Sequence, residues 1–146
     1  METQSNPVSK ETIATDFQTA MQGKLDQAQL DAAVTSLSAA TASYGANGSV
    51  ASMIFYLKFQ VNVTGGKSFN GNAGGISSPG GGALFGDIYT DDINRLYSST
   101  HSFQFNATPV YLNINFFDGN SNFLGSFQSG GISTVLGTGG GTGSWK

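Results

Sequence analysis

The chain has 146 residues and a formal net charge of −3 at pH 7, and only 10% of its residues are charged. This length suits one domain of ordinary size, and the acidic balance argues against a nucleic-acid binder, which would carry a basic patch. The chain has no cysteine and a single histidine, His101. These counts exclude disulfides, thiolate nucleophiles, zinc–thiolate sites and metal sites that need several imidazoles.

Composition changes near Gly48. Before this point the acidic residues outnumber the basic ones five to two, whereas the rest of the chain has four of each. Glycine is distributed in the opposite way, because 18 of its 21 occurrences follow Gly48. We therefore predict two parts: a helical or partly disordered N-terminal extension over residues 1–48 and a β-barrel domain over residues 49–146.

The N-terminal extension shows helical periodicity after a polar lead-in over residues 1–8, which is expected to be disordered. Apolar residues recur at helical spacing over 9–22 and again over 26–42, and Gly23 separates the two predicted helices. Their apolar faces are narrow and rich in alanine, so neither helix is expected to be stable alone. We interpret the extension as a tether or a lid that docks on the second part, with a membrane-surface or partner-binding helix as the alternative.

Most of the remaining sequence alternates between apolar and polar residues, as a strand with one buried face does. The longest such run, residues 53–63, predicts one strand whose odd positions face inward. Shorter strands are predicted over 67–72, 83–89, 103–107, 110–116, 123–128, 132–136 and 144–145. Turns are predicted at Gly65-Gly66, at 118–122 and at Gly130-Gly131. The glycine-rich run 137–143 is expected to be flexible or tightly bent.

A short helix is predicted between the strands. Thr90 is a candidate cap, and Asp91 and Asp92 suit the positive N-terminus of a helix. Its inner face is predicted to consist of Ile93, Leu96 and Tyr97. The fold class is therefore mainly β: a compact eight-stranded antiparallel β-barrel with one short helix. Closure is favoured over a sandwich because this charge-poor chain has few ways to protect exposed strand edges.

The interior of the predicted barrel should be filled. Large side chains are expected to point inward at Phe55, Leu57, Phe59, Phe103, Phe105, Leu112, Ile114, Phe116 and Phe127. An eight-stranded barrel is only just wide enough to hold such side chains, which argues against a lipocalin-like carrier. A transmembrane barrel would reverse the two faces, and several predicted strands fall short of the ~9–11 residues needed to span a bilayer.

No motif assembles a catalytic, cofactor or metal site. Gly66-Lys67-Ser68 lacks the earlier glycine and the following helix of a phosphate-binding loop. Residues 118–122 begin like a calcium loop, but Phe123 stands where that loop needs glycine and Ser129 where it needs a bidentate glutamate. A hairpin turn is the simpler interpretation.

The acidic residues also have simpler explanations than catalysis. Asp87 with Asp91 or Asp92 could form a carboxylate pair of the glycosidase kind. Helix capping and pairing with Arg95 three or four residues later account for Asp91 and Asp92 more simply, and His101 is expected to be exposed at a junction. We therefore predict no catalytic residues, no cofactor and no metal, and a protein that is not an enzyme.

Several runs resemble a known family. They are the run from Gly81 to Asp92 followed by Leu96-Tyr97, the run from Tyr111 to Asp118, Phe123-Leu124-Gly125, and the glycine-rich end that closes on Trp145. These runs are similar to those of the Vap family, the virulence-associated proteins of Rhodococcus. The resemblance covers roughly residues 50–146. It implies an eight-stranded antiparallel barrel with a short helix, and it transfers no catalytic residues.

The resemblance also implies a role: a secreted, non-enzymatic protein that promotes intracellular survival in host macrophages by disturbing phagosome and endolysosome maturation. The secreted localisation comes from the resemblance alone. The start Met1-Glu2-Thr3-Gln4 has neither the basic residues nor the apolar core of a signal peptide.

Any such role is expected to use the outer surface of the barrel. We expect surface contacts from Tyr56, Phe85, Tyr89, Tyr111 and Phe117. Aromatic side chains with a polar tip suit a membrane interface, so the expected partner is a host endolysosomal membrane or a host protein, approached by a monomer. The alternative function is a carbohydrate-binding, lectin-like module that recognises a glycan through exposed tyrosine rings and asparagine amides.

Overall fold

The computed structural model describes residues 18, 27–28, 31, 35, 42–108, 111–133 and 137–146. The elements are β1 (Ala42–Ser52), β2 (Tyr56–Val63), β3 (Ser68–Ser77), β4 (Gly80–Thr90), α3 (Ile93–Ser99), β5 (Ser102–Thr108), β6 (Tyr111–Phe117), β7 (Phe123–Ser133) and β8 (Gly137–Trp145). The helices predicted over 9–22 and 26–42 lie almost wholly outside these ranges. Within the described ranges, no helix combines the length and the apolar run needed to cross a membrane.

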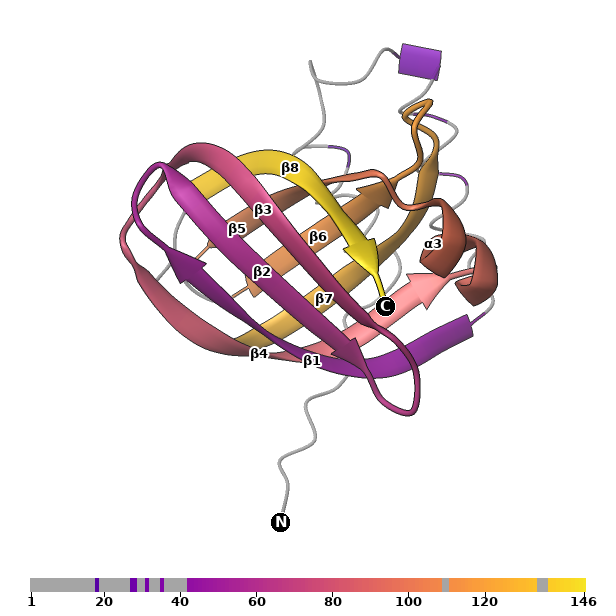
Figure 1. Cartoon of the computed structure of the whole chain (residues 1–146), viewed down its shortest axis with the longest axis horizontal. Helices are drawn as coiled ribbons and strands as arrows, with labels where there is room; N and C mark the ends of the chain where they lie inside the picture. Colours follow the sequence, from indigo (N-terminus) through magenta and orange to yellow (C-terminus); the bar gives the residue numbers. More distant parts are fainter. Residues whose placement is uncertain are drawn as a thin grey trace.

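The eight strands close into a barrel. Their order around it is β1-β2-β3-β8-β5-β6-β7-β4, and every neighbouring pair is antiparallel. Figure 1 shows the closed sheet with α3 at one end, beside the point where β4 ends and β5 begins. The predicted mainly β, eight-stranded antiparallel barrel with one short helix is therefore confirmed.

Aromatic rings fill the interior, as predicted. The largest fully buried side chains are Phe59, Phe69, Phe103, Phe105, Phe116, Phe127, Leu57 and Leu84. The ring of Phe69 lies at the centre of this cluster, with centroid distances of 5.4 Å to Phe103, 5.0 Å to Phe116 and 5.4 Å to Trp145. Edge-to-face and tilted contacts at such distances are favourable ring geometries. The six phenylalanine rings of this cluster face inward, whereas Phe55 and Phe85 are exposed.

The first strand is the main element that the sequence pattern misses. β1 spans Ala42–Ser52, so the predicted division at Gly48 falls inside it. Its inward positions include Ala46, Gly48 and Val50, which pair with residues of β2 and β4. A Cβ at Gly48 would collide with the backbone carbonyl of Gln60. Small residues are needed there, and small residues give no hydrophobic alternation to detect.

The predicted strand over 53–63 starts too early. β2 begins at Tyr56, and Leu57, Phe59, Val61 and Val63 are buried as expected. Phe55 was expected inside the barrel, and that prediction is wrong because its side chain is 69% exposed. The period-two pattern continues through the turn between β1 and β2, so the pattern alone cannot show where the strand begins.

Two predictions about glycine are also wrong. Gly130-Gly131 is not a turn, because it lies inside β7, and the run 137–143 forms most of β8. A Cβ at Gly143 would lie 2.5 Å from the ring of Phe69, and a Cβ at Gly139 would lie 2.9 Å from the ring of Phe105. These two glycines therefore leave room for core rings.

The helix α3 is found where it is predicted but with a different cap. Asp92 is the N-cap, and its Oδ1 accepts a hydrogen bond from the backbone N–H of Arg95 at 3.0 Å. Thr90, the predicted cap, lies two residues before Asp92. Its Oγ1 accepts a hydrogen bond from the N–H of Asp92 at 3.2 Å and donates one to the carbonyl of Leu124 at 2.8 Å. Leu96 is buried, and Ile93 and Tyr97 pack against the core as predicted.

Candidate functional site

The predicted surface residues divide into two groups in the structure. Tyr56 and Phe85 are exposed, at 51% and 56%. Tyr89 and Phe117 were expected at the surface, and this is wrong because they are 6% and 4% exposed. The side chain of Tyr111 lies outside the described part of the structure. A contact role for any of these five residues remains a prediction.

The burial of Tyr89 and Phe117 belongs to a wider feature of β6 and β7. Polar residues that alternate with the inward-facing ones on these strands are themselves at most 2% exposed: Asn113, Asn115, Ser126 and Gln128. Phe117 contacts the ring of Phe123, with the centroids 6.0 Å apart. Alternation therefore identifies the outer face of these strands correctly, but that face is not solvent-accessible.

Exposed apolar side chains gather at the β1–β2 turn instead. Met53, Ile54, Phe55 and Tyr56 are consecutive and are 78%, 41%, 69% and 51% exposed. We call residues 53–56 the apolar tip. Sequence reasoning assigned Phe55 to the core and selected only Tyr56 of these four for the surface. The run of four consecutive apolar or aromatic residues at the β1–β2 turn was the signal that could have identified the tip.

Backbone hydrogen bonds hold the apolar tip in a tight turn. The N–H of Met53 donates to the carbonyl of Tyr56 at 2.8 Å, and the N–H of Phe55 donates to the carbonyl of Met53 at 3.0 Å. The N–H of Ile54 donates to Oγ of Ser52 at 3.2 Å. Ile54 itself has φ +79°, a left-handed conformation that β-branched residues rarely adopt. The turn is thus defined by its own bonds while its side chains remain in solvent.

The two ends of the barrel differ in charge. The β1–β2 and β3–β4 connections lie at one end, which we call the hairpin end; α3 and the β2–β3 and β6–β7 turns lie at the other, the helix end (Figure 1). Of the charged residues that the structure describes between 42 and 146, Lys58 is nearest the hairpin end. Asp87 lies three residues before the other end of β4, and the rest lie at the helix end: Lys67, Asp91, Asp92, Arg95, Asp118 and Lys146.

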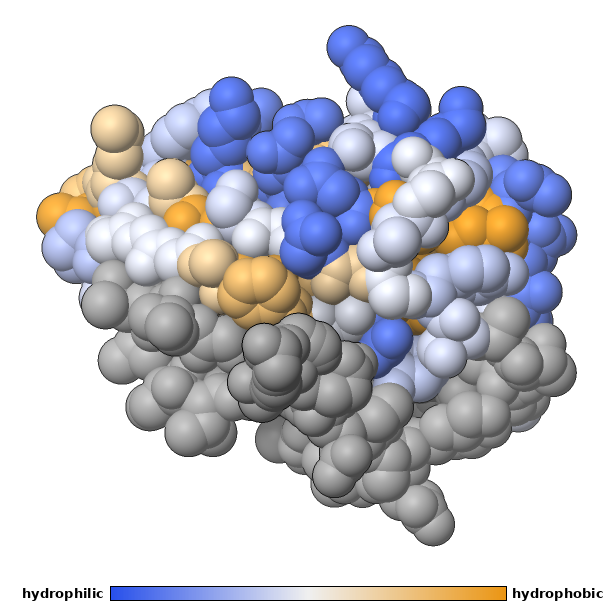
Figure 2. Space-filling model, turned by 90° about the horizontal axis from the view of Figure 1, so that it is seen from below, coloured by the Kyte–Doolittle hydropathy of each residue, from blue (hydrophilic) through white to orange (hydrophobic). Residues whose placement is uncertain are grey.

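The surface view shows the hydrophobic part of the hairpin end. In Figure 2, hydrophobic residues lie at the left end of the face shown and in patches near its middle and right, whereas the most hydrophilic residues lie in its middle and at its right but not at its left end. The left end is the hairpin end of Figure 1, since the two views share their horizontal axis.

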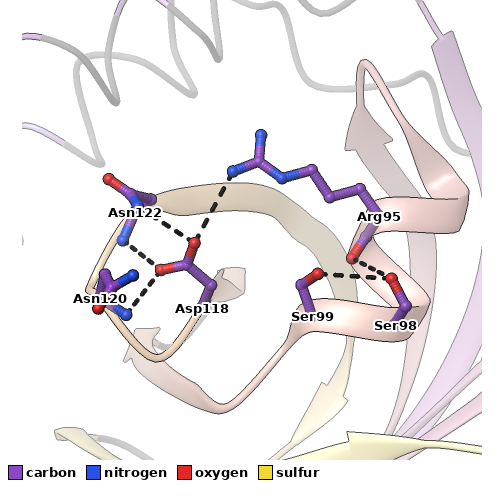
Figure 3. Close-up of polar contacts among 6 residues, drawn as sticks. All are labelled: Arg95, Ser98, Ser99, Asp118, Asn120 and Asn122. Carbon is purple, nitrogen blue, oxygen red and sulfur yellow. Dashed lines mark hydrogen bonds and ion pairs between the residues drawn. The ribbon is translucent and has the colours of Figure 1, made fainter.

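The helix end carries a polar cluster around Asp118 (Figure 3). Its Oδ1 accepts hydrogen bonds from the N–H groups of Asn120 and Asn122, both at 2.9 Å, and its Oδ2 accepts from Nδ2 of Asn122 at 3.1 Å. Nη2 of Arg95 lies 3.7 Å from Oδ2. Burial raises the pKa of Asp118, but these hydrogen bonds and the guanidinium outweigh burial and hold the pKa below its ordinary value.

This cluster is a turn, as the sequence predicts. The oxygens of Asp118 serve their own hairpin, and among the described residues no three acidic or histidine side chains come together as a metal site. The predicted partner of Arg95 is wrong in one respect: its side chain pairs with Asp118 across the turn and not with Asp91 or Asp92. His101 is exposed as expected, and its N–H donates to the carbonyl of Phe117 at 2.8 Å.

Two further titratable groups lie together on β4. Burial raises the pKa of Asp87, whose neighbours across the sheet are Gly45 and Gln128. Burial also raises the pKa of Tyr89, and the charge of Asp87 two residues away raises it further. Both groups therefore favour their neutral forms more than they would in water.

Comparison with known proteins defines the family. The family model described as Rhodococcus equi virulence-associated protein matches residues 3–146. The chain belongs to this family. The matched region includes most of the N-terminal third. The resemblance of individual sequence runs to the family covered only residues from about 50 to 146. No curated protein matches the chain.

Two solved structures of family members are similar to this one. One is the virulence-associated protein VapB from the intracellular pathogen Rhodococcus equi, with 48% sequence identity and a TM-score of 0.68. The other is the virulence-associated protein VapD from the same pathogen, with 43% identity and a TM-score of 0.70. Each match covers 72% of this chain and nearly all of the relative, 96% of VapB and 97% of VapD.

Proposed function

We propose that this virulence-associated protein is secreted and non-enzymatic, and that it promotes intracellular survival in host macrophages. It does so by disturbing phagosome and endolysosome maturation through contacts of its barrel surface. Its partner is a host endolysosomal membrane or a host protein. Family membership supports the virulence role, since the two solved relatives come from an intracellular pathogen.

The filled interior is the observation that supports a surface role. Phe59, Phe69, Phe105, Phe116 and Phe127 are each 0% exposed, and they occupy the centre that a carrier barrel would keep for its ligand. Interiors packed in this way leave few voids larger than a water molecule. Contact with a partner is therefore proposed to take place outside the sheet, through exposed side chains such as those of the apolar tip.

The test is a phagosome maturation assay in cultured macrophages. Latex beads coated with the purified protein are internalised, and acidification and acquisition of a lysosomal marker are followed over time. Beads coated with an unrelated β-barrel protein are the control. We expect delayed acidification and delayed marker acquisition with this protein only. Maturation at the control rate would contradict the proposed function.

A second candidate function, carbohydrate binding, is favoured by one feature of the outer surface. The half-exposed ring of Tyr56 is oriented by a 2.7 Å hydrogen bond from its hydroxyl to Oδ1 of Asn72. Asn70 and Gln60 form an exposed cross-strand pair nearby on the same strands. A fixed aromatic face beside amides can stack on and hydrogen-bond to a sugar ring. A glycan array probed with the labelled protein tests this candidate, and an array with no bound glycan removes it.

A further inference from the structure

We propose that the apolar tip, residues 53–56, inserts into the headgroup region of a lipid bilayer, so that the barrel contacts the membrane with its hairpin end. This inference rests on the proposed function, because it names the partner as a membrane and identifies the part of the surface that touches it. The tip is the largest run of consecutive exposed apolar side chains within the described residues.

The shape of the tip suits insertion. Its side chains project from the turn that joins two neighbouring strands, and Met53 and Phe55 are 78% and 69% exposed. Hydrogen bonds within the turn and the left-handed backbone of Ile54 define its conformation before any contact is made. A preorganised apolar turn loses little conformational freedom when it enters the bilayer.

The order of side chains along the hairpin matches the depth profile of a membrane interface. Met53, Ile54 and Phe55 lie at the extremity, and Tyr56 begins β2 with its hydroxyl bonded to Asn72. Lys58 follows two residues later on the same outward face and is exposed. Tyrosine prefers the headgroup level, and lysine extends its ammonium group toward lipid phosphates.

The charged residues described between 42 and 146 agree with this orientation. Asp87, Asp91, Asp92 and Asp118 lie in the half of the barrel that carries α3, together with Lys67, Arg95 and Lys146, and away from the tip. A carboxylate near the tip would oppose entry into the bilayer, and among these residues the one nearest the tip is the cation Lys58. The tip therefore combines apolar side chains with a charge that complements anionic lipid.

A bilayer fits this surface better than a protein partner does. A stable protein interface buries about 800 Å² on each partner, whereas the tip offers four side chains that are between 41% and 78% exposed. A lipid interface can take up an exposed apolar turn without a partner surface shaped to fit it.

Vesicle flotation tests the inference on the full chain. We expect the protein to float with phosphatidylcholine vesicles and to float more strongly when they contain phosphatidylserine. Phe55→Ser is expected to reduce binding about tenfold or more, because a large side chain no longer leaves water. Phe85→Ser is the matched control: Phe85 is 56% exposed but lies in the middle of β4, and binding should not change.

The contribution of Lys58 is separable from that of the tip. Lys58→Gln is expected to reduce binding to vesicles with phosphatidylserine about fivefold and to leave binding to pure phosphatidylcholine unchanged. Lys67→Gln at the helix end is the control and should change neither. All four variants alter exposed side chains, so their melting temperatures should stay within about 5 °C of that of the parent protein.

A site-specific probe tests the orientation directly. The chain has no cysteine, so Phe55→Cys and Phe85→Cys each provide one site for an environment-sensitive fluorophore. Added vesicles should shift the emission of the dye at position 55 to the blue and leave the dye at position 85 unchanged. The single tryptophan, Trp145, is buried at the helix end and should report no change.

Two outcomes would overturn the inference: a parent protein that does not float, or Phe55→Ser that floats as well as Phe85→Ser. Either result leaves the proposed function standing if phagosomes that contain the coated beads still mature slowly. Normal phagosome maturation together with tip-dependent flotation would instead contradict the proposed function and leave the membrane contact intact.

Discussion

Ile54 has the least favourable backbone conformation among the described side chains of the hairpin end. Its φ of +79° places the Cβ of a β-branched residue close to the following carbonyl group, which costs of order 1–2 kcal/mol. The hydrogen bonds of Met53, Phe55 and Ile54 around the turn hold it there. Such strain is often found where a side chain is presented to a partner, as the insertion proposed for the tip requires.

Asp87 and Asp118 have pKa values shifted in opposite directions. Burial raises the pKa of Asp87, so its ionised form destabilises the folded state as the pH rises through that raised pKa. Hydrogen bonds and Arg95 lower the pKa of Asp118. Its ionised form therefore stabilises the folded state above the ordinary carboxyl pKa of ~3.9, and the contribution is lost as the pH falls through the lowered value.

Urea unfolding across a pH series should separate the two residues. At pH 7, Asp118→Asn is expected to lower the free energy of unfolding by about 1 kcal/mol, because the ion pair and one hydrogen bond are lost at a solvent-screened site. Asp87→Asn is expected to raise it by roughly 0.5 kcal/mol. The Asp87 difference should disappear as the pH falls below the ordinary carboxyl pKa of ~3.9, whereas the Asp118 difference should persist until the pH falls below its lowered pKa. The same sign for both substitutions at pH 7 would contradict the assigned causes.

At the scale of elements, β3 and β8 show why glycine is abundant. The two strands pair with each other from Phe69↔Trp145 to Ser77↔Gly137. A Cβ at Gly71 would lie 2.7 Å from ring atoms of both Phe69 and Phe103, whereas a Cβ at Gly74 would meet nothing within 4 Å. Some glycines in these strands, such as Gly71, are therefore needed because a larger side chain would collide with core rings. Others, such as Gly74, can be replaced without a collision.

Alanine substitutions on β3 test this distinction. Gly71→Ala is expected to lower the free energy of unfolding by about 1–3 kcal/mol, because the rings it would meet are at most 1% exposed and cannot move aside. Gly74→Ala, three residues further along the same strand, should change it by less than about 0.5 kcal/mol. Chemical denaturation of both variants gives the comparison. Equal losses would show that the backbone, and not the rings, requires glycine.

For the whole molecule, the ring cluster joins strands that are distant in the sequence. Phe69 on β3 contacts Phe103 on β5, Phe116 on β6 and Trp145 on β8. The cluster connects these strands across the interior as well as through their backbone pairing. The same packed core therefore connects the hairpin end, which carries the apolar tip, with the helix end, which carries most of the charged residues described between 42 and 146.

Removing the central ring should weaken the whole barrel. Phe69→Ala is expected to cost about 3–5 kcal/mol of unfolding free energy, through lost burial and a cavity. Phe85→Ala, at an exposed site, should cost less than about 1 kcal/mol. Thermal and urea unfolding followed by the fluorescence of Trp145 measures both. A small loss for Phe69→Ala would mean that the core is less tightly packed than the ring distances indicate.

Local patterns were sufficient for the larger features. Alternation over 57–63 and 112–116 predicted the strands and their inward residues, and the spacing of Ile93, Leu96 and Tyr97 predicted the short helix. These predictions succeeded because each depends on residues close together in the chain. They failed at Phe55, where the same alternation continues into a turn.

The candidate site was predicted only in part. Tyr56 and Phe85 were correctly expected at the surface, but Met53 and Phe55 were missed, and Tyr89 and Phe117 are buried. Exposure on an outer face depends on what packs against that face, which no short window of sequence contains.

The amino-acid sequence by itself determined the mainly β class, the phenylalanine-filled centre and the lack of cysteine chemistry, because composition and period-two alternation are local properties. Only the tertiary structure decided that glycine-rich segments are strands, that the outer faces of β6 and β7 are buried, and how far each side chain of the apolar tip is exposed. Glycine-rich strands such as β3 and β8 are far apart in the chain and become neighbours only when the barrel closes, so no local pattern shows that they pair.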